Sequence, residues 1–237
     1  HLPDTAQIVV VDAEGQQVPY QITSDEKVIF PVTVQANGSA VYTIKAGIPQ
    51  ECPVKACGRY YPERVDDVAW ENDLTAFRAY GPALQETGER AFGYDIWTKY
   101  NTTEPVVEAR YEGELNPDMK AKIAELGKTD PKAAQELYRS VSYHVDHGNG
   151  LDCYKVGPTL GGGTTALMAG DTIIYPYCYA TQEILDNGPL RFTVKLVYNP
   201  LVVKGDSTII ETRIITLDAG SYCNKTVVSY TNLKETM

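Results

Sequence analysis

Titratable side chains gather in the segment YHVDHGNGLDCYK, which spans residues 143–155. Two of the chain's three histidines lie there, and histidine is the side chain that exchanges a proton most readily near neutral pH. Glycines make the segment a loop, which a rigid strand scaffold can position. A structural role, such as hydrogen bonding to loop carbonyls, fits either histidine equally well. The candidate site residues are His144, Asp146, His147, Asp152, Tyr154 and Lys155.

A metal site is a second interpretation of the same segment. Asp146, Asn149 and Asp152, with glycines between them, resemble an oxygen-rich calcium loop. His144 and His147 would suit zinc. The spacing matches neither an HExxH helix nor an EF-hand loop, so Ca²⁺ at Asp146 and Asp152, or no metal at all, is the cofactor prediction.

A second cluster lies in WENDLTAFRAY, residues 70–80. If both halves are strands, Glu71 and Asp73 share one face, and Arg78 and Tyr80 share one face while Phe77 points the other way. An ordinary solvated strand face gives the same alternation. The nearby segment PTLGGGTTAL lacks the GK[ST] of a phosphate loop, so its glycines indicate a tight turn or a close backbone approach.

The elements that must position these residues are mostly strands. Residues 104–142 differ, because they are charged, rich in helix formers and carry Pro117 and Pro131 directly after Asn116 and Asp130. They predict two short helices, with Asp130 as an N-cap and Gly127 as a C-terminal stop. Alternating runs predict strands over 7–12, 18–23, 27–34, 39–47, 68–73, 75–80, 94–100, 171–187, 190–203, 207–220 and 221–233.

Composition excludes some classes of function. A net charge of -10 and a pI near 4.8 remove the usual electrostatic basis for nucleic-acid binding. No apolar run reaches the length of a membrane span. The absence of an initiator methionine suggests removal of an upstream segment and therefore export, where Cys52 and Cys57 could pair.

Three blocks carry a resemblance to a known bacterial family: WENDLTAFRAYGPAL, YHVDHGNGLDCYKVGPTLGGG and EILDNGPLRFTVKLVY. They resemble the signature blocks of the domain of unknown function 4861. The resemblance implies a periplasmic or secreted protein from gene clusters that degrade acidic polysaccharides. It also implies an antiparallel β-sandwich of the galactose mutarotase-like supersandwich type over residues 1–237, with the helical insertion at 104–142. Members of the family are longer at both ends, so the remaining segment of a longer chain is an expected partner.

Such a family context suggests an acidic, uronic-acid-containing oligosaccharide as substrate, and β-elimination is the first hypothesis. Elimination needs a cation for the carboxylate, a base for the adjacent proton and an acid for the departing oxygen. Arg78 and Lys155 would bind the carboxylate, His144 would be the base and Tyr154 the acid, in a lyase or a dehydratase. Predicted substrate-binding residues are Trp70, Glu71, Asp73, Tyr80 and His147.

Two alternatives remain open. A glycoside hydrolase would use Glu71 and Asp73, or Asp146, as acid and base across the glycosidic bond. A non-catalytic carbohydrate-binding protein would use its aromatic rings, including many of the 17 tyrosines, as platforms. An unsaturated product separates elimination from both.

Overall fold

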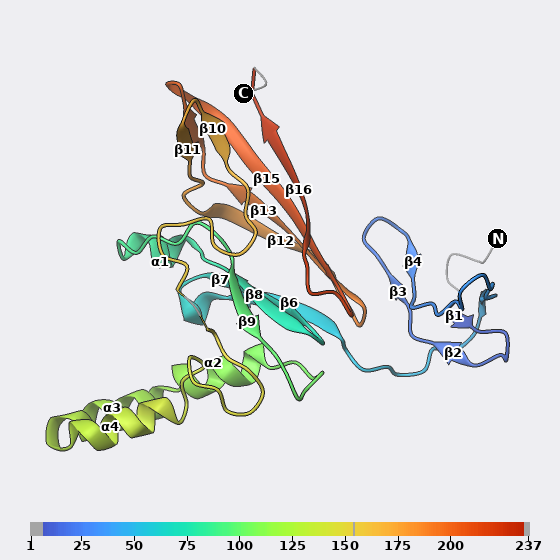
Figure 1. Ribbon diagram of the computed structural model, residues 1–237, viewed down its shortest axis with the longest axis horizontal. Coiled ribbons are helices and arrows are strands. Elements are labelled where there is room, and N and C mark those ends of the chain that lie inside the picture. The colour runs from blue at the N-terminus through green and yellow to red at the C-terminus, as the bar shows by residue number, and fades with distance from the viewer. Residues whose placement is uncertain (1–6, 154, 235–237) are drawn as a thin grey trace.

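The computed structural model describes residues 7–153 and 155–234. It is mainly β, with antiparallel sheets and a short helical insertion, as the sequence predicts. Figure 1 shows two large sheets packed together as a β-sandwich, with the helices to one side. No helix of the described residues is long and apolar enough to cross a membrane.

The first sheet has four strands in chain order: β6 (Ala56–Tyr61), β7 (Asp67–Asn72), β8 (Thr75–Ala79) and β9 (Asp95–Thr98). The second sheet contains β12 (Tyr179–Asn187), β13 (Arg191–Tyr198) and β15 (Asp206–Asp218), and both β14 (Leu201–Val203) and β16 (Lys225–Thr231) pair with β15. A separate small hairpin consists of β10 (Leu167–Ala169) and β11 (Thr172–Ile174). Sequence patterns miss β6, because its start resembles a cysteine-bounded loop; Cys52 and Cys57 are both free.

The main core lies between the two sheets. Trp70 of β7 stacks on Phe77 of β8 and on Phe192 of β13, with ring centroids 5.8 and 6.2 Å apart. Strand alternation sends the next residues of β7 and β8 to the opposite face. A second apolar cluster covers that face, and Trp97, Tyr111 and Tyr143 are among its members.

The helical insertion contains three helices rather than the expected two: α2 (Val107–Leu115), α3 (Pro117–Thr129) and α4 (Pro131–Arg139). Asn116 caps α3 and Asp130 caps α4 through side-chain oxygens, as predicted for Asp130. The prediction of Gly127 as a stop is wrong, because Gly127 lies inside α3. A further short helix, α1 (Pro82–Glu86), follows β8, and a 3-10 turn spans Pro62–Arg64.

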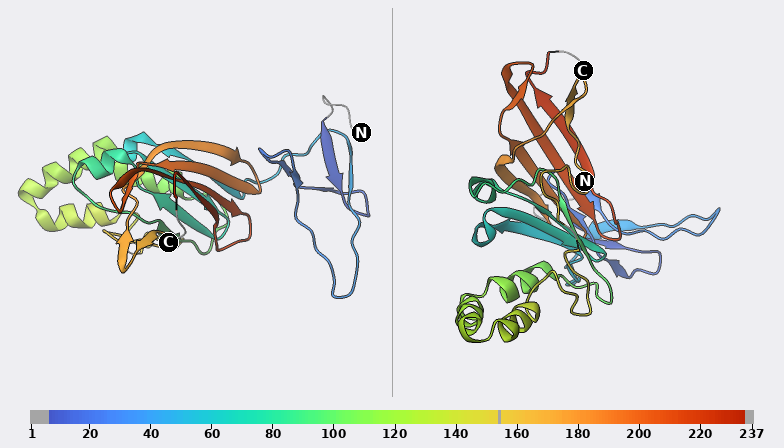
Figure 2. Two further views of the ribbon diagram at one scale, coloured as in Figure 1. Left: turned by 90° about the horizontal axis from the view of Figure 1, so that it is seen from above. Right: turned by 60° about the vertical axis from the view of Figure 1, so that its left-hand side comes forward.

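The N-terminal strands form a lobe apart from the sandwich, as Figures 1 and 2 show. This lobe contains β1 (Ile8–Val11), β2 (Gln17–Val18), β3 (Gln21–Ile22), β4 (Val28–Ile29) and β5 (Thr43–Ala46). Its strands join neither large sheet, so the sandwich begins at Ala56 rather than at the first residue. The Gln21 side chain links the lobe to the β12–β13 turn, since it accepts from the backbone N–H groups of Leu190 and Arg191 and donates to the Arg191 carbonyl.

Candidate functional site

Arg78 is the centre of a buried charged cluster on the helix-covered face of the first sheet. Its side chain is 3% exposed. It donates hydrogen bonds to the carboxylates of Asp95 and Asp152, the second at 2.9 Å, and its Nε lies 3.9 Å from Asp67. Its guanidinium also donates to the Tyr80 hydroxyl at 3.2 Å. Three carboxylates therefore share one cation, which leaves Arg78 little free charge for a ligand.

Asp152 enters this cluster from the loop after α4. The loop runs beside β9, where the Thr98 N–H donates to the Leu151 carbonyl at 2.9 Å and Asp152 forms a bridge to Trp97. The Asp152 N–H in turn donates to the Tyr143 carbonyl at 2.9 Å, which closes the loop on itself. Backbone pairing thus fixes a loop carboxylate next to a strand arginine.

His144 lies against Asp152. Its Nδ1 is 3.4 Å from the Asp152 carboxylate oxygen Oδ2 and 3.4 Å from the Asp152 carbonyl. Both oxygens accept hydrogen bonds when the carboxylate is ionised, so the proton of a neutral imidazole belongs on Nδ1 and the lone pair on Nε2. The side chain of His144 is 49% exposed, whereas that of Asp152 is 1% exposed. A buried carboxylate therefore orients a histidine that solvent can reach.

A cavity of about 450 Å³ opens beside this pair. It brings together five of the predicted site residues: Arg78, Tyr80, His144, Asp152 and Lys155. Arg64, whose side chain is 23% exposed, also lines it. Tyr154, the predicted acid, lies outside the described residues. The remaining lining residues are Glu89, Leu151 and Cys153.

Burial raises the pKa of two carboxyl groups in the cluster. The pKa of Asp152 rises to about 6, because desolvation outweighs the attraction of Arg78, and Asp95 adds repulsion. The pKa of Asp67 rises to about 7, again mainly through desolvation and against the attraction of Arg78 and Arg64. One oxygen of each carboxylate is buried without a hydrogen-bond partner among the described residues. The cluster therefore holds its protons at higher pH than ordinary carboxylates do.

Three predicted substrate-binding residues lie elsewhere. Trp70 is fully buried between the sheets, so its ring cannot stack on a sugar, and that prediction is wrong. Glu71 is buried too; its carboxylate accepts from Lys99 Nζ at 2.8 Å and from the N–H groups of Val106 and Val107 at the start of α2. Asp73 accepts from the Gly220 N–H at 2.7 Å. Glu71 and Asp73 thus have structural partners and do not line the His144 cavity.

The predicted metal ligands do not converge. Asp146 accepts from the N–H groups of Gly148 and Gly150 and from the Tyr100 hydroxyl, whereas Asp152 faces Arg78 and His144. Within residues 7–153 and 155–234, no three His, Cys, Asp or Glu side chains come close enough to hold a metal ion. His147 points to another partner, the Ser142 carbonyl, at 3.0 Å.

The glycine-rich segment serves close backbone packing. Gly161 bridges to Tyr94, and a Cβ on Gly161 would lie 2.4 Å from the Tyr94 carbonyl oxygen. A Cβ on the facing Gly93 would lie 1.8 Å from the carbonyl oxygen of Leu160. Two chain segments meet at a distance that no side chain permits, as one of the two sequence interpretations predicts.

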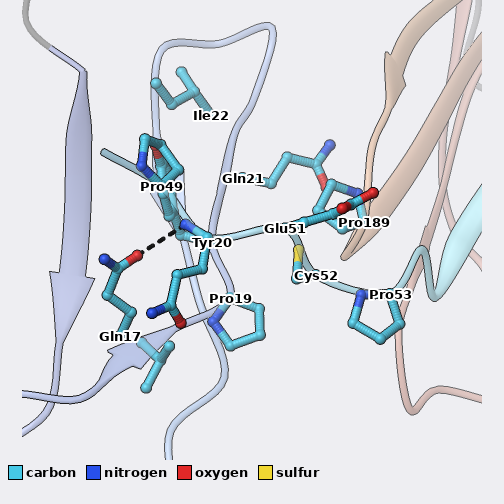
Figure 3. A pocket seen from close by; sticks show the side chains of 12 residues that line it. Gln17, Pro19, Tyr20, Gln21, Ile22, Pro49, Glu51, Cys52, Pro53 and Pro189 are labelled. Carbon is cyan, nitrogen blue, oxygen red and sulfur yellow. Dashed lines mark hydrogen bonds between the residues drawn. The ribbon is translucent and has the colours of Figure 1, made fainter. Parts of the chain in front are cut away.

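A separate cavity of about 540 Å³ lies between the N-terminal lobe and the sandwich. Figure 3 shows Pro49, Pro53 and Pro189 around it, with Tyr20 and Cys52. Gln17 bridges its wall by accepting from the Gln50 N–H at 3.0 Å. None of the predicted site residues lines this cavity.

The sequence patterns do not indicate several members of the charged cluster: Arg64, Asp67, Asp95 and Tyr143 as a hydrogen-bond partner; nor do they indicate Glu89 as a residue that lines the cavity. Asp95 and Asp67 lie in strands, where an aspartate in the sequence is normally interpreted as a solvent-exposed residue. Their only sequence signal is the strand register, since Asp95 pairs with Arg78 across β8 and β9. The motif around Tyr143 gives no sign of its role, although its hydroxyl accepts from Arg78 and Arg64 at 3.3 Å.

Comparison with known proteins gives a family but no reaction. The chain is 29% identical over 185 residues to "Uncharacterized protein P7" of Formosa agariphila; the match covers 75% of this chain and 41% of that protein, so the chain spans less than half of its relative. No solved structure matches it. The family model described as "Domain of unknown function (DUF4861)" matches residues 1–237, and the chain belongs to that family.

Proposed function

We propose that the His144 cavity binds an acidic sugar and that His144 removes a proton from it in a β-elimination. The observation that carries this proposal is the orientation of the imidazole. Asp152 holds the proton on Nδ1, which leaves Nε2 of a half-exposed histidine as a free base. The buried carboxylate also stabilises the imidazolium that forms when the base takes a proton.

The residues that we propose to neutralise the sugar carboxylate differ in part from the pair predicted from the sequence, Arg78 and Lys155. Arg78 is buried and shared among Asp67, Asp95 and Asp152, so we give it a positioning role. Lys155, an exposed residue, and the partly exposed Arg64 line the same cavity and take the carboxylate-binding role. Neutralising that carboxylate makes the neighbouring C–H more acidic.

Nε2 of His144 takes the proton at C5 of the uronate, and the C–H electron pair becomes the C4–C5 double bond. The C4–O bond breaks, and its electron pair stays on the departing oxygen, which takes a proton from an acid. Tyr154 is the proposed acid. The departing group is a sugar in a lyase or water in a dehydratase.

Two broader parts of the proposal follow from the family resemblance. We propose an acidic oligosaccharide as the partner and a periplasmic or secreted location, where such substrates occur. The acidic pI of about 4.8 supports the exclusion of nucleic acid as a partner. Since the chain covers 41% of its curated relative, the activity of the whole protein also belongs to the proposal.

The test is ultraviolet absorbance of the new conjugated double bond during incubation with intact and lyase-derived acidic oligosaccharides. His144→Ala should lower the rate roughly 100- to 10,000-fold, the range of general base catalysis. Lys195→Ala is the control, because Lys195 pairs with Glu183 on the second sheet and lines neither this cavity nor any predicted site, and it should retain activity on that substrate.

Three other outcomes would contradict the proposal. A fully active His144→Ala protein would contradict the assignment of the base. New reducing ends without the chromophore would replace elimination by hydrolysis. Sugar binding with neither signal would replace catalysis by a binding role.

A further inference from the structure

A second cavity, of about 360 Å³, lies on the other side of the loop that carries His144. The loop residues divide between the two cavities. His144 and Asp152 line the first, whereas Val145, His147 and Asn149 line the second. Helix α2 forms the opposite wall. The two histidines that share one sequence motif therefore face two different spaces.

Arg110 of α2 gives this second cavity its charge. It lines the cavity, is 9% exposed and lies with its guanidinium carbon 5.6 Å from the centre of the Trp97 ring. Nη2 donates to the carbonyls of Thr98 and Asn149, at 3.1 and 3.0 Å. Nη1 has no partner among the described residues. Burial lowers the pKa of Arg110, which marks a cation whose charge is poorly compensated.

The nearest carboxylates are already engaged. Glu71 is paired with Lys99 at 2.8 Å, and Asp152 with Arg78 at 2.9 Å. Within the described part of the chain, no carboxylate forms an ion pair with Arg110. Buried arginines are normally paired, and one that is not paired costs stability unless a ligand completes it.

His147 adds a polar group at the rim. Its Nε2 faces the Ser142 carbonyl at 3.0 Å, and because a carbonyl only accepts, Nε2 carries the proton. Nδ1 is then an acceptor, which suits a ligand hydroxyl rather than a carboxylate. His147 is exposed, so a ligand in the cavity can reach it.

We propose that this second cavity binds a sugar unit through its carboxylate, with Arg110 as the charge partner and His147 as an acceptor for a sugar hydroxyl; the choice of a sugar rests on the proposed function. The volume of about 360 Å³ falls within the range of ligand sites of roughly 300–1,000 Å³. The site does not depend on the reaction at His144. It gives the protein two places for acidic sugar units, on either side of one loop.

The experiment is amide NMR of the full chain titrated with D-glucuronate, with methyl glucoside as the neutral probe. The amides of Ala109 and Gly113 report on the second cavity, and those of Leu151 and Cys153 on the first. We expect Ala109 and Gly113 to shift and saturate with glucuronate and not with the neutral sugar. Failure of the His144 proposal would appear at Leu151 and Cys153 instead, so the two proposals fail separately.

Ala109 offers a matched pair of variants that leave Arg110 in place. Ala109 is an exposed residue of α2, where glutamate and glutamine are both good helix formers. Ala109→Glu puts a competing negative charge at the cavity and should weaken glucuronate binding there at least tenfold, while Ala109→Gln should not. Equal affinities of the two variants, an equal response to methyl glucoside, or no shift at Ala109 and Gly113 would each overturn the proposal.

Discussion

Two buried arginines of the sandwich have similar surroundings and different consequences. Arg78 and Arg213 are both almost fully buried, both pair with carboxylates, and both lie near tyrosine rings. Arg213 pairs with Glu211, is shielded from solvent, and donates to the Tyr94 hydroxyl and to Thr164 at 3.1 and 3.2 Å. It fastens the segment that follows the three glycines onto the core.

Arg78 differs in where its network ends. Its partner Asp152 touches a histidine that is half exposed and lines a cavity. Arg213 instead donates to the Thr164 hydroxyl and the Thr165 carbonyl, groups that do not exchange protons near neutral pH. We therefore take a buried charge that orients an exposed titratable group, rather than a buried charge alone, as the feature that distinguishes a candidate reactive site.

Removing Arg213 should have the largest effect on stability. Arg213→Met leaves Glu211 buried without its cation, and we expect the free energy of unfolding to fall by about 3–5 kcal/mol. Adding Glu211→Leu should recover much of that loss, because an apolar pair replaces an uncompensated charge. Urea unfolding measures both. A single variant within about 1 kcal/mol of the parent would show that the pair stabilises little.

Removing Arg78 should affect both folding and chemistry. Arg78→Met leaves the buried carboxylates of Asp95 and Asp152 without their cation. We therefore expect the free energy of unfolding to fall by about 3 kcal/mol. The folded fraction should also lose elimination activity, because Asp152 is no longer held against His144. Arg213→Met should keep the activity of each folded molecule. Full activity in folded Arg78→Met would contradict the view that the Arg78 cluster supports the reaction while the Arg213 cluster supports only the fold.

Asp152→Asn should separate chemistry from folding inside the Arg78 cluster. The amide keeps the shape but not the charge that stabilises the imidazolium, so kcat should fall roughly 10- to 100-fold. The pKa of Asp152 is about 6, so in the parent the carboxylate gains a proton as pH falls through 6 and activity falls with it. The variant should lack this contribution to the pH–rate profile. An unchanged kcat would refute the orienting role of Asp152.

Asp67 should give the smallest effect, visible as pH dependence of stability. Its pKa is about 7 in the folded chain, above its ordinary value of 3.8. The folded state therefore holds a proton that the unfolded state releases, and the unfolding free energy should fall as pH rises from about 4 to about 7. Asp67→Asn should flatten that slope across the window. Identical slopes in denaturant titrations would contradict a raised pKa.

Local sequence patterns predicted the parts of the fold that depend on neighbours in the chain. Alternation in β7 and β8 placed Phe77 and Arg78 on opposite faces, and the caps before the prolines located α3 and α4. Helix α2 was not predicted as a separate helix, because its start is capped by Glu71 from a distant strand rather than by a nearby side chain. Trp70 was misassigned since alternation gives two faces without saying which one is buried.

The candidate site was predicted where its residues are neighbours in the chain or in the strand order. His144, Asp152 and Lys155 are close in sequence and share a cavity, and Arg78 reaches it through strand order. His147 follows His144 by three residues in the same motif, yet it lines the second cavity instead. Arg64 gave no signal, because only the fold brings the 3-10 turn against the loop.

Imidazole rescue of His144→Ala tests the role of His144 most directly. If His144 is the base, added imidazole should restore part of the elimination rate, in proportion to its concentration of free base. Lys155→Ala, which removes a charge rather than a base, should show no rescue. Absence of rescue in His144→Ala, with the sugar still bound, or a variant as active as the parent without imidazole, would contradict proton abstraction by His144.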